Sequence, residues 1–232
     1  FPRRAKIWAV GEGGILKNSW RVAQQLISHN GDFDAWIRQT GETPIQNNGA
    51  LATWLTKSLG REDLSDGDSP KIAGMMEILL TQGQWGASFR LAYAMDVADS
   101  IDDVMKQSDV RKVGRAADNV FEAWLKGAQV AGARTLQDVF NQNKGRIDDL
   151  KNSLLNATRL DTHGLNQEKK ELLAERAIHY FFFNDLEESG RLFSDRADGT
   201  FCYVLGSSLY PGEILFATYK QSMYVGYDLE SE

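Results

Sequence analysis

The spacing of apolar residues changes near Gly190, where residues 190–205 read GRLFSDRADGTFCYVL. The Asp-Gly pair at 198–199 lies between two β-prone runs, which is the signal of a β-hairpin. Two further β-prone runs follow, at residues 214–219 and 223–227. The pattern predicts an antiparallel sheet of three or four strands within residues 190–228.

Before Gly190 the apolar residues repeat mostly at helical spacing. Leu16, Trp20 and Ile27 indicate a first helix, and Phe33 and Trp36 a short second one. Further helices are expected at 51–59, from the Ser69-Pro70 pair onward, at 87–106, at 108–128, along 136–155, and from an Asn166 cap to Leu186.

The fold class that follows is mainly α (α+β), with a multi-helix body and a small C-terminal antiparallel sheet. We expect an N-terminal arm and glycine joint at 1–14 and a helical domain at 15–189. A β-hairpin or meander at 190–232 would pack on that helical body.

The six tryptophans are spread over the predicted elements of the body. Trp has a large apolar ring system and one hydrogen-bond donor, so this distribution indicates that each element contributes to one core. We therefore expect Trp20, Trp54, Trp85 and Trp124 to be largely buried.

The composition is that of a globular chain, with 42% hydrophobic and 25% charged residues among 232. No apolar run approaches the roughly 18–20 residues that cross a bilayer, so we expect a soluble protein without a membrane span. The chain starts at Phe1 without an apolar signal-peptide core. We interpret it as a processed product or a fragment, and its localisation stays unknown.

The two ends of the chain carry opposite charge. Residues 1–29 hold five basic side chains against Glu12, whereas residues 184–232 hold nine acidic and three basic ones. This predicts weak, salt-sensitive self-association in which the arm at 1–10 docks on the acidic, Tyr-rich tail of a neighbour. The candidate partner-binding residues are Arg3, Arg4, Lys6, Trp8, Tyr210, Tyr219, Tyr224 and Tyr227.

No complete catalytic or cofactor motif is present in the sequence. The glycine turn at 11–14 is followed by Leu16 where a dinucleotide fingerprint or a phosphate loop needs glycine. The three histidines lack metal-site spacing, and the lone Cys202 lies in a predicted strand, where a small buried thiol is the usual role. We therefore expect no cofactor and no metal, and catalytic residues stay unknown.

Three function classes remain open. The first is a non-catalytic protein-binding or assembly module, such as a structural or effector protein of a virus or a bacterium. The second is a nucleic-acid-binding protein, because a helix at 166–190 followed by the hairpin has the helix–strand–wing–strand order of a winged helix. However, that helix carries acidic side chains that oppose a phosphate backbone, among them Glu171, Glu175, Glu187 and Glu188. The third is an enzyme whose residues meet only in the fold.

Overall fold

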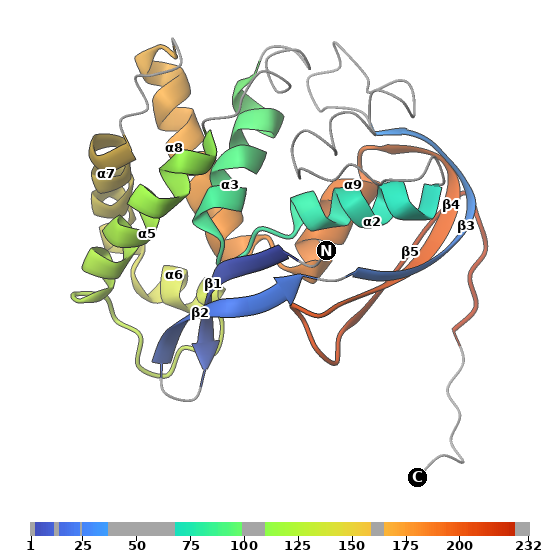
Figure 1. Ribbon diagram of the computed structural model, residues 1–232, viewed down its shortest axis with the longest axis horizontal. Coiled ribbons are helices and arrows are strands. Elements are labelled where there is room, and N and C mark those ends of the chain that lie inside the picture. The colour runs from blue at the N-terminus through green and yellow to red at the C-terminus, as the bar shows by residue number, and fades with distance from the viewer. Residues whose placement is uncertain are drawn as a thin grey trace.

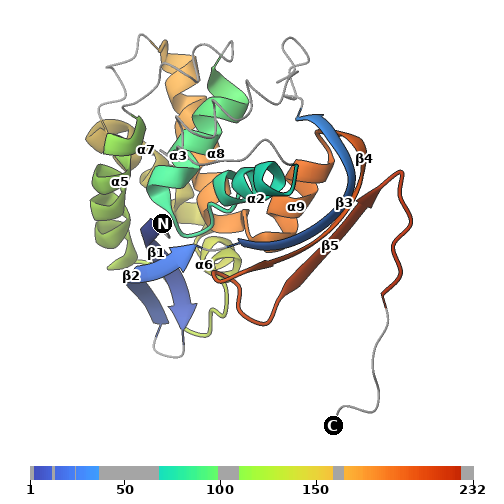
Figure 2. The same cartoon turned by 45° about the vertical axis from the view of Figure 1, so that its right-hand side comes forward.

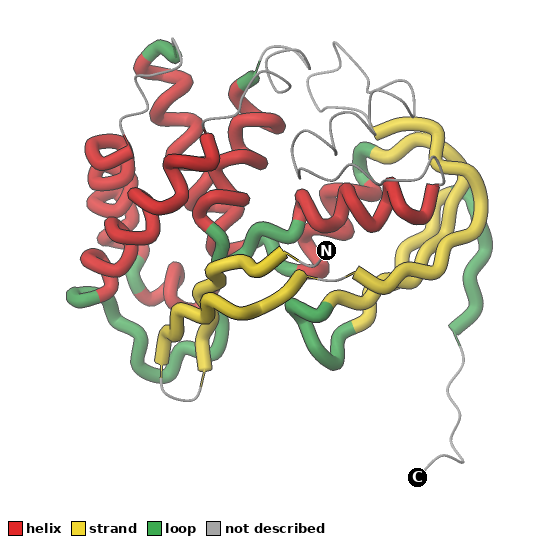
Figure 3. The backbone as a smooth tube through the Cα atoms, viewed as in Figure 1, coloured by secondary structure: helices red, strands yellow, loops and turns green. Residues whose placement is uncertain are grey.

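The structure, a computed structural model, describes residues 3–11, 14–23, 25–36, 68–98, 110–158 and 165–225. Within these ranges helices predominate and the strands form two antiparallel sheets (Figure 1, Figure 3). The mainly α, α+β class is thereby confirmed. The strands are β1 (Arg3–Gly11), β2 (Gly14–Ala23), β3 (Gln25–Trp36), β4 (Ala197–Ser207) and β5 (Ile214–Tyr219). The α-helices are α2 (Asp68–Leu79), α3 (Trp85–Ala92), α5 (Val110–Leu125), α6 (Leu136–Gln142), α7 (Ile147–Thr158), α8 (Gln167–Phe183) and α9 (Leu186–Ser194).

An aromatic cluster joins α3, α5 and α8 into the helical body. Trp85 stacks on Phe181 with ring centroids 3.9 Å apart, and Phe121 meets both rings edge-on. Trp85 and Trp124 are buried, as expected. Trp54 and the side chain of Trp20 lie outside what the structure describes.

The first run of the expected hairpin, residues 190–194, belongs to helix α9 instead of a strand. Asp185 caps this helix, because its side chain accepts a hydrogen bond from the backbone N–H of Glu188 at 3.0 Å. Leu192 and Phe193 then lie on the buried side of the helix. The N-cap and this helical spacing outweigh the β-propensity of the residues.

The C-terminal sheet has the strand order β3-β4-β5, so one of its strands comes from the N-terminal part of the chain. The Asp-Gly pair at 198–199 is not a turn, because it lies inside β4 and pairs with Ala35 and Phe33 of β3. Residues 223–225 form no strand, and 226–227 lie outside the described residues.

The N-terminal helices expected at 15–27 and 33–37 are wrong. Strands β1 and β2 form a hairpin there, with Val10 opposite Ile15 and Gly11 opposite Gly14, and β3 follows. The residues expected to form an arm, 1–14, therefore contain a paired strand. β-branched residues such as Ile15 and Val22 suit this pairing.

Helices α2 and α9 lie in the hollow of the curved β3-β4-β5 sheet (Figure 2). Phe201, Tyr203 and Leu205 of β4 point toward them and are at most 1% exposed. The Phe193 ring of α9 lies 5.9 Å from Phe201 and 5.6 Å from Tyr203, centroid to centroid. The sheet is thus anchored to the body through one face.

The order of elements at the C-terminal end also differs from that of a winged helix. Two helices, α8 and α9, precede β4, and the central strand pairs with β3 from the N-terminal part. The 198–199 pair, expected at the tip of a wing, lies within the sheet.

Candidate functional site

On the outer face of the β3-β4-β5 sheet, the strand register places residues of the three strands side by side in rows. Residues opposite one another across neighbouring strands share a face, and successive residues alternate between faces. Three outer rows therefore run across all three strands: Leu26–Gly206–Ile214, Ser28–Val204–Phe216 and Asn30–Cys202–Thr218. We call these nine residues the outer patch.

The outer patch is uncharged and largely apolar, with Ser28, Asn30 and Thr218 as its polar members. Its residues on β3 and β5 are exposed, whereas those on β4 are half-buried. Leu26 is 81% exposed, Ile214 61% and Phe216 46%. None of the nine positions is Asp, Glu, Lys or Arg. Contiguous exposed apolar residues on a soluble protein mark an interaction surface more often than chance, because their exposure opposes solubility without aiding the fold.

Strand β5 lies at the edge of this sheet among the described strands. Edge strands present unpaired backbone groups, and proteins commonly protect them with charged residues or proline. Residues 214–219 read ILFATY and contain neither. Strand β5, which borders the outer patch, therefore lacks both kinds of edge protection.

The four predicted partner-binding tyrosines do not form one surface. Tyr219 is 38% exposed and packs its ring 5.8 Å from that of Phe201, at the margin of the inner face. Tyr224 is 94% exposed, Tyr210 lines a cleft elsewhere, and Tyr227 lies outside the described residues.

The N-terminal part of the predicted surface is also rearranged. Trp8 is only 5% exposed, because its ring meets Phe121 edge-on at 5.1 Å and its Nε1 donates to Asp118 at 2.9 Å. It belongs to the core, so it is removed from the candidate partner surface. The side chains of Arg3, Arg4 and Lys6 are outside what the structure describes, although their backbone is part of β1.

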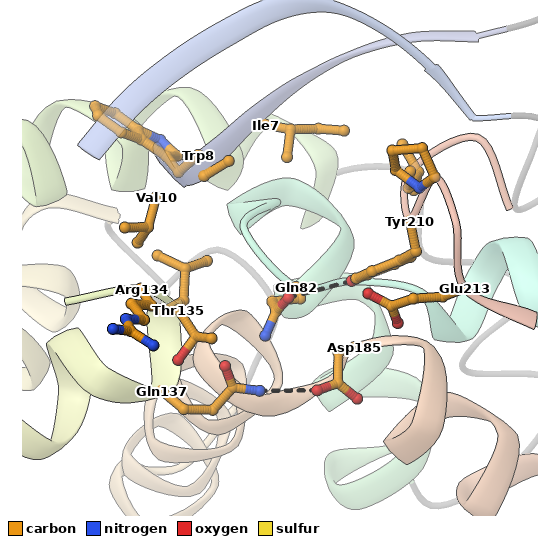
Figure 4. Close-up of a pocket in the computed structure, with 14 residues that line it drawn as sticks. Ile7, Trp8, Val10, Gln82, Arg134, Thr135, Gln137, Asp185, Tyr210 and Glu213 are labelled. Carbon is orange, nitrogen blue, oxygen red and sulfur yellow. Dashed lines mark hydrogen bonds between the residues drawn. The ribbon is translucent and has the colours of Figure 1, made fainter. Parts of the chain in front are cut away.

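A cleft of about 290 Å³ forms a second candidate site, between the edge of β1, the start of α6 and the β4–β5 connection (Figure 4). Residues far apart in sequence meet there. Its lining residues are Ile7, Trp8, Ala9, Val10, Gln82, Arg134, Thr135, Leu136, Gln137, Asp185, Leu209, Tyr210, Pro211 and Glu213. Of the predicted partner residues, the cleft brings together Trp8 and Tyr210.

Hydrogen bonds hold the polar floor of the cleft in place. The Tyr210 hydroxyl donates to Gln82 Oε1 at 3.3 Å, and Gln82 Nε2 donates to the carbonyl of Phe182 at 3.0 Å. Gln137 Nε2 donates to Asp185 Oδ2 at 2.9 Å. Asp185 also caps α9, so this carboxylate is a structural group that links two helices.

Two oppositely charged side chains lie at opposite ends of the cleft in Figure 4, Arg134 and Glu213. Both are exposed, and neither side chain forms a salt bridge within the described part of the chain, although the charge of Arg134 also acts on the nearby Asp138 carboxylate. The backbone N–H groups of Arg134 and Thr135 donate to Asp138 Oδ2 at 2.8 and 2.9 Å, and these bonds hold the pKa of that carboxyl below its usual value. The same bonds fix the backbone that carries Arg134 at the rim.

A polar cluster joins α8 to the π-helical turn at Tyr93–Val97. The buried Tyr180 hydroxyl donates to Asp96 Oδ2 at 2.8 Å, and burial raises the pKa of this phenol well above its usual value. Arg176 Nε lies 3.7 Å from Asp96 Oδ1. His179 stacks on Phe183, and partial burial lowers the pKa of its imidazole. These bonds tie α8 to the turn, which is a structural role.

His, Asp, Glu and Cys side chains in the described ranges are the remaining candidates for catalysis or metal binding. Among those residues no group of three His, Cys, Asp or Glu side chains is placed to hold a metal ion. Cys202 is partly buried, and its cross-strand neighbours are Asn30 and Thr218 rather than a histidine. No helix in this part of the chain is both long and apolar enough to span a membrane.

No protein-family model matches the sequence, and no curated protein or solved structure is significantly similar to it. The outer patch and the cleft are therefore the features of the described residues that bear on function. Leu26, Ile214, Phe216, Arg134 and Glu213 were absent from the sequence-based candidates. The alternation of Ile214, Phe216 and Thr218 was visible as a strand signal, but the sequence did not indicate which face would be covered.

Proposed function

We propose that the protein is a non-catalytic assembly module that associates with a second copy of itself through the outer patch. The main support for this proposal is that Leu26, Ile214 and Phe216 are exposed on one uncharged face of the sheet. Packing two such faces would remove these apolar side chains from water, which is the main favourable term in protein association.

The absence of charge in the outer patch favours a second copy as the occupant. In a two-fold contact each residue faces the same patch on the partner, so a charged patch would meet its own sign. The whole chain has a net charge of −6, yet the outer patch contributes none of it. Self-association through this face therefore brings no like charges into direct contact.

This proposal replaces the mechanism in which the arm at 1–10 docks on an acidic tail. Those residues include the paired strand β1 and the buried Trp8, so they are part of the fold. The two mechanisms differ in salt dependence. Contact between charged ends weakens as salt screens it, whereas apolar association persists and is strengthened by sulfate.

Sedimentation equilibrium over a concentration series, at low and high salt, tests the proposal. We expect a monomer–dimer equilibrium that high salt does not weaken. Ile214→Glu would place an unpaired charge in the contact and should weaken the dimer by at least about tenfold, equivalent to about 1.4 kcal/mol. Ile214 is mostly exposed, so the folded monomer should tolerate the change.

Asn141→Glu is the matched control, because it adds the same charge at an exposed position on α6. This variant should dimerise like the unmodified protein. A monomer at every concentration, or a dimer that Ile214→Glu and Asn141→Glu affect equally, would overturn the proposal.

A further inference from the structure

The cleft is independent of the outer patch, and its first informative feature is the edge of β1. Trp8 donates its backbone N–H to the carbonyl of Gly83 at 2.8 Å, so this group points away from β2. Backbone direction in an antiparallel strand repeats every second residue. The N–H and C=O of Val10 therefore point away from β2 as well, on the edge of β1 that borders the cleft.

The hairpin register supports this assignment. Trp8 is opposite Lys17 and Val10 is opposite Ile15. Hydrogen-bonded and non-hydrogen-bonded pairs alternate along an antiparallel ladder, so Val10 and Ile15, two residues from Trp8 and Lys17, form a non-hydrogen-bonded pair as well. No hydrogen bond joins the Val10 backbone to another described residue outside its strand. An extended backbone in the cleft would find a donor and an acceptor there.

The second feature is charge. Arg134 is at one end of the cleft and Glu213 at the other, both exposed and both without a salt bridge among the described residues (Figure 4). A ligand that satisfies both carries an anion at one end and a cation at the other. The carboxylate and the ammonium of a peptide with free termini have this arrangement.

The third feature is size and lining. A volume of about 290 Å³ is just below the usual range for ligand sites, roughly 300–1,000 Å³, and therefore suits a short ligand. The β1 wall and the residues Leu136, Leu209 and Pro211 are apolar, whereas Gln82 and Gln137 supply amide groups at the floor. A short ligand with a polar backbone and apolar side chains matches this lining.

We infer that the cleft binds a short peptide with free termini and apolar side chains. Its carboxylate pairs with Arg134, its ammonium group with Glu213, and its backbone with the edge of β1 at Val10. This binding site is separate from the outer patch, so the inference does not depend on the assembly proposal.

Isothermal titration calorimetry with two peptides tests the inference. The probe is dileucine with free termini, and its matched control is the same peptide with an acetylated N-terminus and an amidated C-terminus. We expect heat of binding from the first peptide and at least about tenfold weaker binding of the blocked one, because two charge-assisted contacts are lost.

Three variants locate the contacts. Arg134→Gln and Glu213→Gln should each weaken dileucine binding by about fivefold to tenfold. Lys126→Gln, an exposed charge change outside the lining, should leave it unchanged. Val10→Pro removes the N–H that borders the cleft while leaving the β1–β2 ladder bonds intact, and proline is tolerated at such an edge position. It should also weaken binding.

Circular dichroism and the unfolding midpoint show whether each variant is folded. If Val10→Pro fails to fold, the comparison of free and blocked dileucine on the unmodified protein still tests whether the free termini contribute to binding. Equal affinity for the two peptides, no binding of dileucine at millimolar concentration, or full affinity in a folded Val10→Pro variant would each overturn the inference.

Discussion

The two faces of the β3-β4-β5 sheet are built from the same strands but have opposite environments. On the inner face Phe201, Tyr203 and Leu205 are at most 1% exposed and pack against α2 and α9. On the outer face Leu26 and Ile214 are more than half exposed. Both faces are rich in apolar residues, so composition alone does not explain the difference.

The difference in burial separates the apolar residues that stabilise the folded chain from those that stay exposed on it. Inner residues lose their contact with water only if the sheet lies on the helices, so they determine where the sheet packs. The outer residues Leu26 and Ile214 stay largely exposed in the single chain, so packing on the helices does not account for their apolar character. We propose that association with another copy of the chain accounts for it.

The largest expected change in stability follows from removing an aromatic ring from the inner face, compared with the same change on the outer face. Phe201→Ala should lower the free energy of unfolding by about 3–5 kcal/mol, because it leaves a cavity between the sheet and α9. Phe216→Ala, the same change on the outer face, should cost less than about 1 kcal/mol in the monomer. Urea denaturation at low protein concentration measures both. Similar losses for the two variants would mean that the faces do not differ in their contribution to folding.

The inner face should also make the protein sensitive to alkali. Burial raises the pKa of Tyr203 from 10 to about 12, against a smaller opposite effect of its hydrogen bond with Ser194. The unfolded chain loses this proton near pH 10, before the folded protein does. The resulting stability is fully present below pH 10 and lost as the pH rises toward 12, by about 2–3 kcal/mol in total.

Tyr203→Phe isolates this contribution, because it keeps the ring and removes the titrating group. Urea unfolding between about pH 9 and about pH 11.5 should show a shallower loss for the variant than for the unmodified protein. Parallel pH profiles would show that the phenol at position 203 ionises as readily in the folded state as in the unfolded chain.

Helix α9 lies very close to the inner face at Gly190. Gly190 is buried in α9, and a methyl group there would overlap the Cδ2 atom of Leu215 on β5. Gly190→Ala raises helix propensity, but the overlap forces Leu215 or the helix to move, which should cost about 1–3 kcal/mol. The thermal midpoint checks this. An increase in the midpoint would mean that α9 and β5 are farther apart than the structure shows.

Local signals predicted several helices well. The Asn166 cap is confirmed, because its side chain accepts from the Lys169 N–H at 2.8 Å. The helix expected at 108–128 is α5, and the one expected from Ser69-Pro70 is α2, which begins one residue earlier at Asp68. Caps and apolar periodicity act within a few residues, so the sequence contains what is needed to find them.

The N-terminal strands were missed because long-range pairing determines them. The spacing of Leu16, Trp20 and Ile27 fits a helix, but β2 pairs with β1, and β3 pairs with β4 about 170 residues later in the chain. The two candidate sites could not be predicted either, because they form between residues that are far apart in the sequence. Arg134 and Glu213 line the same cleft only in the folded chain. Phe201 and Val204 are both apolar, so the sequence does not distinguish the two faces of β4.

The smallest expected effect is an increase in stability on the outer face. Gly206 occupies the outer row between Leu26 and Ile214, and a methyl group there would meet no atom within 4 Å. Its backbone is not among those with positive φ, so alanine fits without strain. Gly206→Ala should stabilise the monomer by about 0.4–1 kcal/mol, because it restricts the unfolded chain.

Gly206→Ala is the same chemical change as Gly190→Ala. We expect it to raise the free energy of unfolding, whereas Gly190→Ala lowers it, because only the inner face is packed against the helical body. Urea denaturation of both variants, at a concentration where the protein is monomeric, makes the comparison. If Gly206→Ala destabilised the monomer, part of the same chain would have to cover the outer patch. The exposed residues Leu26 and Ile214 would then already have their partner, and the patch could not serve as an assembly surface.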